Sequence, residues 1–287
     1  MMNPSKKLYG LVGHPIKHSF SPLMHNAAFK ELNINGEYRL FEKSPQELDL
    51  FLETLDKENI YGLNVTVPYK EKVLNFVELD QESHYLQQIK AVNTIVKQGK
   101  IWKGFNTDVV GFSRHLKEVF DASGKTVALL GAGGAARAVV YALVKKEVAK
   151  IDIFDIDRSR SASVAALVKE LSSEIGVEAV GSIEELDIKN KDLLINATPV
   201  GLKETDPCLV KEELLHKDLF VYDLIYNPSE TKLLSLARKN AARGCNGLDM
   251  LVYQAAFSFC FFTQTEVKVD RIIDIMKKAV EEELKRR

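Results

Sequence analysis

The chain has 287 residues, of which 46% are hydrophobic and 28% are charged, and these shares are typical of a compact globular protein and exclude a disordered or low-complexity chain. The length predicts roughly two domains. The chain has 39 Lys and Arg against 40 Asp and Glu, a formal net charge of -1, which excludes bulk attraction to nucleic acid or to an anionic membrane.

Three cysteines, Cys208, Cys245 and Cys260, form no CxxC pair, so neither a disulfide framework nor a zinc site is predicted and a cytoplasmic location is expected. The N-terminal segment has no apolar run of signal-peptide length, so no export is expected. The stretch 126–144 is apolar enough to resemble a membrane span. Because Arg137 and a glycine-rich run interrupt it, a strand followed by a helix is predicted instead.

In the first hundred residues, short β-branched runs alternate with helical patterns. Strands are predicted at 8–12, 37–42 and 61–67, and this alternation is typical of parallel βαβ units. Helices are expected to open at Ser21-Pro22, with Ser21 as the N-cap, and at Ser44-Pro45. The run 91–105, with Gln98-Gly99 between two β-rich halves, predicts a hairpin on the edge of a mixed sheet.

A second alternating series follows a helical pattern at 107–120 and a polar break. The pattern predicts strands at 126–130, 150–154, 192–196 and 219–224, with helices at 134–146, 159–175 and 230–242. This order is typical of a doubly wound nucleotide-binding fold. The last two segments, 250–262 and 269–287, are predicted to be helices that return to the first domain, the second of them amphipathic.

The predicted fold class is therefore α/β with two domains. Residues 1–112, joined by about 250–287, are predicted to form a mixed-sheet domain. Residues 113–249 form a dinucleotide-binding domain of the Rossmann type.

A glycine-rich turn, GAGGAARA, lies between a predicted buried strand and a helix. Gly131 permits the tight turn, Gly133 lets a pyrophosphate approach the backbone, and Ala136 permits close packing of the helix on the strand. The N-terminus of the helix then offers unpaired N–H groups to phosphate. A turn of this kind that only packs is the competing interpretation, and the strand before it and the acid that ends the next strand favour nucleotide binding.

Asp155 ends the second nucleotide strand, 24 residues after Gly131, close to the spacing expected for the acid that binds the adenosine ribose. A carboxylate at this position repels a 2′-phosphate, so NAD is favoured over NADP. Arg158 and Arg160 follow at once and are either solvated or in contact with that phosphate.

Several polar residues of the first domain have ordinary structural interpretations when each is taken alone. Ser19 and Ser21 fit a turn and a helix cap, and Asn64, Asn106 and Thr107 fit turns at strand ends. The six histidines have no metal-ligand spacing, and no metal is predicted. Polar residues at strand ends of an α/β sheet, however, collect in one crevice.

The strings GHPIKHSFSPLMHN, GLNVTVPYKE, AVNT, GFNTD, GAGGAARA, INATPVGL, DLIYNPSET and NGLDMLVYQAAFSF occur in this order and together closely resemble the shikimate dehydrogenases. The resemblance runs from about Leu8 to the end of the chain. It implies a substrate domain and a Rossmann domain with the active site in the cleft between them. It also implies the reversible reduction of 3-dehydroshikimate to shikimate in aromatic amino-acid biosynthesis.

The resemblance implies a role for individual residues of this sequence. Lys70 and Asp108 would be the catalytic pair. Substrate-binding residues would be Ser19, Ser21, Thr66, Asn93, Asp108, Tyr226 and Gln254. Cofactor-binding residues would be Gly131, Ala132, Gly133, Gly134, Ala135, Asp155, Arg160, Thr198 and Gly247.

The residues after the second nucleotide strand depart from the usual family pattern. The family's NADP form has an Asn-Arg-Thr run there, whereas this chain has Asp155-Ile156-Asp157 and resembles the NAD-using quinate/shikimate dehydrogenases. The cofactor is therefore NADP or NAD, with NAD favoured, although Arg160 matches a basic position of the family.

Two alternatives remain open: a quinate or dual-specificity dehydrogenase, and a non-catalytic nucleotide-binding regulator with the same fold. The expected partner is a small-molecule substrate, and neither a nucleic acid nor a membrane is expected as a partner. The protein is expected to be a monomer or a homodimer.

Overall fold

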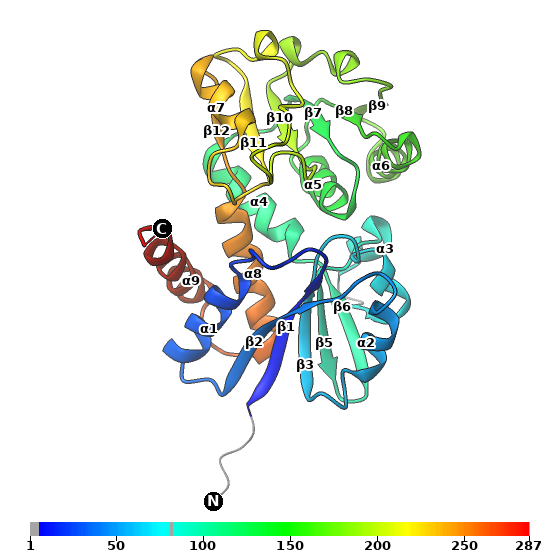
Figure 1. Ribbon diagram of the computed structural model, residues 1–287. Coiled ribbons are helices and arrows are strands. Elements are labelled where there is room, and N and C mark those ends of the chain that lie inside the picture. Colours follow the sequence, from blue (N-terminus) through cyan, green and yellow to red (C-terminus); the bar gives the residue numbers. More distant parts are fainter. Residues whose placement is uncertain (1–5, 81–82, 287) are drawn as a thin grey trace, which may run out of the picture. The chain divides into compact units, whose positions relative to one another are not determined.

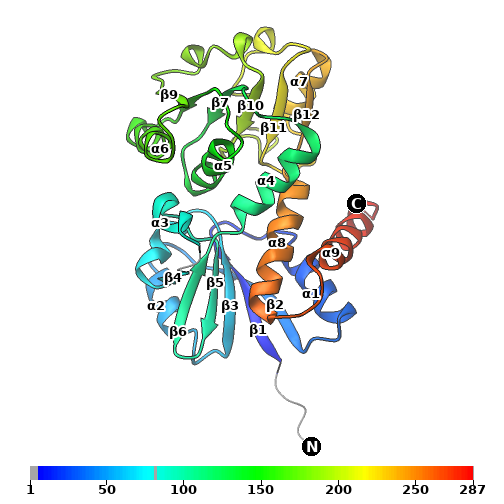
Figure 2. The same ribbon diagram turned by 180° about the vertical axis from the view of Figure 1, so that it is seen from behind.

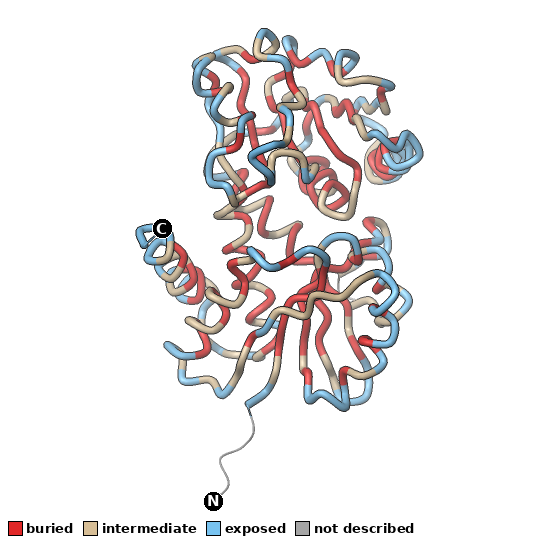
Figure 3. Tube along the Cα trace, viewed as in Figure 1, coloured by how far each residue is buried: buried red, intermediate tan, exposed pale blue. Residues whose placement is uncertain are grey.

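The computed structural model describes residues 6–80 and 83–286 and divides into two compact units (Figure 1). Unit 1 comprises residues 1–107 and 252–287, and unit 2 comprises residues 108–251. The first five residues of the N-terminal segment and the last residue of the final predicted helix lie outside the described residues. The inner strands of both sheets are buried along most of their length, whereas the outermost strands are largely half-buried or exposed (Figure 3).

Unit 1 contains a mixed sheet in the order β2-β1-β3-β5-β6-β4. Its strands are β1 (Lys7–Gly13), β2 (Gly36–Glu42), β3 (Ile60–Val65), β4 (Glu78–Leu79), β5 (Thr94–Gln98) and β6 (Ile101–Phe105). β1 runs parallel to β2 and β3, and β5 is antiparallel to β3 and β6. The predicted mixed sheet and hairpin are confirmed, and Gly99 has a φ of 63° in the hairpin turn. The hairpin is not on the edge, however, because the two-residue strand β4 pairs with β6 and is too short to be visible in the pattern.

The helices of unit 1 are α1 (Ser21–Glu31), α2 (Leu48–Thr54), α3 (Tyr85–Ile89), α9 (Val269–Leu284) and α8 (Leu248–Thr263) from Val252 onward. A short 3-10 helix, η1, spans Lys72–Asn75. α9 packs on α1 through a buried apolar face, as the periodicity predicts.

Both predicted helix starts are wrong in detail. Ser21 is the first helical residue rather than the cap, which is Phe20, and its hydroxyl accepts a hydrogen bond from Ser19. Ser44 lies in a turn closed by the Glu47 carboxylate, so α2 begins only at Leu48.

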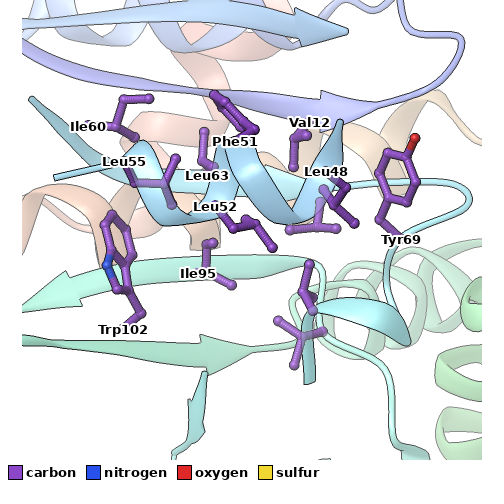
Figure 4. Packing of buried hydrophobic residues seen from close by; sticks show 13 residues of the cluster. Val12, Leu48, Phe51, Leu52, Leu55, Ile60, Leu63, Tyr69, Ile95 and Trp102 are labelled. Carbon is purple, nitrogen blue, oxygen red and sulfur yellow. The ribbon is translucent and has the colours of Figure 1, made fainter. Parts of the chain in front are cut away.

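The two faces of the unit 1 sheet differ in character, because successive side chains of a strand point to opposite faces. Leu63 and Val65 of β3 belong to an apolar core with Phe51 of α2 (Figure 4). On the other face the Nδ2 of Asn64 donates to the Ser258 hydroxyl of α8 at 2.8 Å. α8 lies along this second face (Figure 2), so polar side chains from the strands and from α8 meet in the interior.

His25 of α1 is buried without a hydrogen bond at either ring nitrogen in the described structure. Its ring stacks on Tyr38, with centroids 4.1 Å apart, and aromatic side chains of α8 lie nearby. Burial lowers the pKa of His25 from 6.5 to about 3. Since the unfolded chain accepts this proton near pH 6.5 and the folded chain does not, the contribution of neutral His25 is complete above pH 6.5 and falls as the pH drops toward 3.

Replacing His25 with phenylalanine is therefore expected to flatten the acid limb of the stability profile. The wild-type free energy of unfolding should lose up to about 1.4 kcal/mol per pH unit through this one group below pH ~6. Urea unfolding at pH 7.5, 5.5 and 4.5 measures this slope, with the exposed-site variant His84→Gln as control. A His25→Phe slope equal to that of wild type would contradict the assignment.

Unit 2 contains a six-stranded sheet in the order β12-β11-β10-β7-β8-β9, with every pair parallel. Its strands are β7 (Thr126–Leu130), β8 (Lys150–Phe154), β9 (Gly176–Ala179), β10 (Leu193–Asn196), β11 (Phe220–Asp223) and β12 (Arg243–Cys245), and its helices are α4 (Asp108–Val119), α5 (Gly134–Val144), α6 (Arg158–Leu171) and α7 (Lys232–Lys239). In β11, Val221 shares a core with Leu233 of α7, whereas the ring of Tyr222 lies 5.0 Å from that of Phe112 of α4. Helices thus cover both faces, which confirms the predicted doubly wound fold.

The apolar stretch 126–144 forms β7 and α5, as predicted. Among the described residues, no helix is both long and apolar enough to cross a membrane.

Candidate active site and nucleotide-binding loop

Most of the predicted substrate residues of unit 1 lie at one end of its sheet. The ends of β1 and β3 are paired through Val12 and Val65, and the start of β5 is paired with the ends of β3 and β6. Thr66 directly follows β3, and its N–H donates to the Val12 carbonyl at 3.0 Å. Lys70 follows in the next turn, where its carbonyl accepts the Val92 N–H at 2.8 Å. The topology therefore gathers residues that are far apart in the sequence at this end.

Ser19 and Ser21 form a hydrogen-bonded pair in the loop between β1 and α1. The Ser19 hydroxyl donates to the Ser21 hydroxyl at 3.1 Å and accepts the Ser21 N–H at 3.2 Å. Because Ser19 supplies the proton of this contact, the proton of the Ser21 hydroxyl is left for another acceptor. Such a pair suits a ligand carboxylate.

Asn93 and Gln254 meet although they are 161 residues apart in the sequence. The Nδ2 of Asn93 lies 3.4 Å from the Gln254 Oε1 and donates to the Thr107 hydroxyl at 3.0 Å. The Oδ1 of Asn93 accepts the Thr107 N–H at 2.8 Å. The predicted pair is thus held in a buried polar network, and two of its members, Thr94 and Ser258, were not predicted from the sequence. Ser258 lies four residues after Gln254 on α8, and this i, i+4 spacing was the available signal.

Asp108 is the first residue of α4 and of unit 2, directly after Thr107, and it is buried. Its predicted pairing with Lys70 stays a prediction. Within the described ranges, no group of three or more His, Cys, Asp or Glu side chains is placed to hold a metal ion.

The glycine-rich turn of unit 2 lies between β7 and α5. Gly131 has a φ of 92°, and a Cβ there would lie 2.9 Å from the Ala197 carbonyl, so glycine is required on both grounds. A Cβ at Gly133 would meet only open space. Ala136 is fully buried, and no side chain caps α5. The turn, with Gly134 and Ala135 at the start of α5, therefore offers backbone N–H groups and room for a pyrophosphate.

Asp155 follows β8 beside this turn. Its Oδ2 accepts the Ala132 N–H at 2.7 Å, and its Oδ1 accepts the Asp157 N–H at 2.9 Å. The carboxylate thus fixes the turn while keeping further lone pairs for ribose hydroxyls. Ile156 is 96% exposed, and the Nε of Arg160 lies 3.5 Å from the Asp157 Oδ2. Position 156 therefore offers no positive charge to a 2′-phosphate, and the guanidinium of Arg160 is paired with the carboxylate of Asp157.

A buried carboxylate, Asp223, organises the loops after β10 and β11. Its Oδ1 accepts hydrogen bonds from the Asn196 Nδ2 at 3.0 Å and the Ile225 N–H at 3.1 Å, and its Oδ2 accepts one from the Thr231 hydroxyl at 2.7 Å. Thr198 is held in turn by the Asn196 Oδ1 at 2.7 Å. Burial raises the pKa of Asp223, against the effect of these hydrogen bonds. Asp223 was not predicted, since a lone acid at a strand end has no distinctive spacing.

The last two predicted residues of unit 2 lie on adjacent loops. Tyr226 follows β11, and Gly247 follows β12. The Gly247 N–H donates to the Ile225 carbonyl at 3.1 Å, and a Cβ at Gly247 would lie 2.1 Å from the Leu224 carbonyl oxygen. Glycine is therefore required for the β11 and β12 loops to approach each other.

The parallel doubly wound sheet, its open glycine turn and an acid after the second strand define the class: a dinucleotide-binding α/β protein. The chain also matches a family model. Residues 11–95 match the shikimate dehydrogenase substrate binding domain. A shikimate dehydrogenase (NADP(+)) from Caldanaerobacter subterraneus subsp. tengcongensis is 43% identical over 266 residues, which cover 91% of this chain and 93% of that protein.

Solved structures agree with the sequence relatives. The shikimate dehydrogenase of Aquifex aeolicus has a TM-score of 0.84 at 35% identity, covering 98% of this chain and 99% of that one. A quinate dehydrogenase from Corynebacterium glutamicum, solved in complex with NAD, has a TM-score of 0.82 at 32% identity, covering 95% and 99%. The chain belongs to the shikimate dehydrogenase family, whose members are oxidoreductases acting on CH–OH groups.

Proposed function

We propose that this protein is a shikimate dehydrogenase, which reduces 3-dehydroshikimate reversibly to shikimate with a nicotinamide nucleotide. Unit 1 binds the acid and unit 2 binds the nucleotide. The observation that carries this proposal is the gathering of the Ser19–Ser21 pair, Lys70 and the Asn93–Gln254 network in unit 1, together with full-length similarity to relatives of that name.

Each group of unit 1 suits a part of the substrate. The serine pair donates to the carboxylate, and Thr66, Asn93 and Gln254 bind hydroxyl or carboxylate oxygens. Three further residues of unit 2 lie on the loops after β10, β11 and β12, namely Thr198, Tyr226 and Gly247. Thr198 and Gly247 are assigned to the nucleotide and Tyr226 to the substrate. These are the roles that the family resemblance implies for these residues, and the positions of the residues in the fold are compatible with them.

Proton transfer is assigned to Lys70. The bound nucleotide supplies or accepts the hydride, and negative charge then develops on the substrate carbonyl oxygen. The Lys70 ammonium donates its proton to that oxygen during reduction, and the neutral amine removes the hydroxyl proton during oxidation. Asp108 pairs with Lys70 and positions it.

The residues of unit 2 fit a dinucleotide, and we assign NAD as the preferred one. The fit rests on the open space at Gly133 and the uncapped start of α5. The preference rests on Asp155, whose carboxylate binds ribose hydroxyls and repels a 2′-phosphate, and on the uncharged Ile156. The NADP(+) relatives favour the other cofactor, and the quinate dehydrogenase solved with NAD favours this one.

The similarity to that quinate dehydrogenase makes quinate the second candidate substrate. Quinate has an additional hydroxyl near its carboxylate. A quinate dehydrogenase is expected to have a threonine at the position of Ser21, so the smaller serine of this chain favours shikimate. Shikimate is therefore the assigned substrate.

A steady-state matrix of shikimate and quinate against NAD and NADP tests this assignment. The kcat/KM value should be highest for shikimate with NAD. Binding of nucleotide without turnover of either acid would identify a regulator with the same fold instead. A higher kcat/KM for quinate would move the assignment to quinate dehydrogenase.

A further inference from the structure

We infer that Ser258 is a positioning residue for the acid substrate, because its hydroxyl sets the orientation of the Asn93 and Gln254 side-chain amides. The inference rests on the proposed function, since it concerns the same ligand. No part of the sequence pattern assigns Ser258 a role beyond packing in an apolar helix.

The Ser258 hydroxyl is fully buried and has four polar neighbours. It donates to the Gln254 carbonyl at 2.9 Å, one turn earlier in α8. The Asn64 Nδ2 lies at 2.8 Å, the Thr94 hydroxyl at 2.9 Å and the Thr107 hydroxyl at 3.0 Å. A serine hydroxyl has one proton and two lone pairs. Because that proton goes to the carbonyl, the two lone pairs of Ser258 accept from the Asn64 Nδ2 and from one of the two threonine hydroxyls at a time.

The two threonines connect Ser258 to the Asn93 amide. The Thr94 hydroxyl lies 2.9 Å from the Asn93 Oδ1, and the Thr107 hydroxyl lies 3.2 Å from the same oxygen. The Thr107 N–H also donates to this Oδ1. The oxygen of the Asn93 amide is therefore surrounded by donors, which fixes which end of the amide is nitrogen.

The same arrangement orients Gln254. Its Oε1 lies 3.4 Å from the Asn93 Nδ2 and 3.3 Å from the Thr107 hydroxyl. Each amide thus uses its oxygen within the network. The Asn93 Nδ2 also donates there, to the Thr107 hydroxyl and toward the Gln254 Oε1, so the Gln254 N–H groups are the donors that this network leaves for a ligand. Gln254, held in this orientation by Asn93 and Thr107, is then a donor toward a ligand oxygen, as the hydroxyl and carboxylate groups of a polyhydroxy acid require.

Removing the Ser258 hydroxyl takes away the acceptor common to Asn64, Thr94 and Thr107. These buried donors must then turn to the remaining acceptors, which include the oxygens of Asn93 and Gln254. The two amides lose their single orientation, so substrate binding should weaken more than the proton transfer at Lys70.

The test compares Ser258→Ala with Thr263→Val. Thr263 is on the same helix and its hydroxyl makes the same kind of bond, to the Phe259 carbonyl at 2.8 Å, but it lies outside the network. Ser258→Ala should raise the KM for shikimate about five- to thirty-fold, with kcat and the KM for the nucleotide within about two-fold of wild type. Thr263→Val should leave all three values unchanged.

A purely structural role predicts the opposite split, with a lower melting temperature and lower kcat but an unchanged KM for shikimate, and this result would overturn the inference. If Ser258→Ala does not fold, Ser258→Cys should show the same rise in the KM for shikimate, because a cysteine nearly preserves the side-chain volume but its sulfur is a poor hydrogen-bond acceptor. A wild-type protein without shikimate turnover would instead overturn the proposed function.

Discussion

Replacement of Lys70 by alanine is expected to lower kcat for shikimate oxidation by about 10²- to 10⁴-fold, with little change in KM. A proton donor stabilises chiefly the transition state, whereas we propose that the serine pair and the amide network bind the ground state. Lys72→Ala is the matched control, because Lys72 is an exposed lysine two residues further along whose Nζ lies over the Tyr69 ring at 5.9 Å. Steady-state kinetics of the two variants measure the difference.

Added primary amines provide a second readout for Lys70→Ala. An amine small enough to occupy the space of the missing side chain should restore part of kcat in a concentration-dependent way. An unchanged kcat with only a raised KM would make Lys70 a binding residue and would require another proton donor.

Exchanging two residues after β8 is expected to change the cofactor preference. Asp155→Asn removes the carboxylate that repels a 2′-phosphate, and Ile156→Arg adds a cation at a position whose side chain is 96% exposed. The double variant should shift the ratio of kcat/KM for NADP to that for NAD about 10- to 100-fold toward NADP, since hydrogen bonds to charged groups contribute roughly 1.5–3 kcal/mol.

The single variants separate the two effects. Ile156→Arg should improve use of NADP with NAD little affected, whereas Asp155→Asn should mainly weaken use of NAD. A wild-type protein that strongly prefers NADP, and loses that preference in Arg160→Ala, would show that the arginine and not the carboxylate determines the choice.

Local chemistry explains which features could be predicted from the sequence. Gly131 needs a left-handed φ that other residues rarely adopt, so the glycine turn is visible in the string itself. The central strands β7 and β10 of unit 2 are nearly continuous apolar runs because both faces of their sheet are covered. The hairpin around Gly99 could also be predicted, because its two strands are adjacent in the sequence and joined by a short turn.

Features that depend on distant partners could not be predicted. The Asn64–Ser258 hydrogen bond joins residues 194 positions apart, and the role of Asp223 depends on Asn196 at the end of β10 and on the loop after β11, which meet only in the folded unit. The strands β4 and β12 have two and three residues, too few for a period. Ser21 was expected to cap α1, but the helix begins one residue earlier than expected, with Ser21 as its first residue and Phe20 as the cap.

Direct hydride transfer is the central claim, and deuterium tests it most directly. Wild-type protein would be given oxidised nucleotide and shikimate that carries deuterium on the carbon bearing the reacting hydroxyl. We predict that the reduced nucleotide gains one deuterium for each 3-dehydroshikimate formed, as observed by mass spectrometry. Reduced nucleotide without deuterium, or no 3-dehydroshikimate at all, would contradict the proposed function.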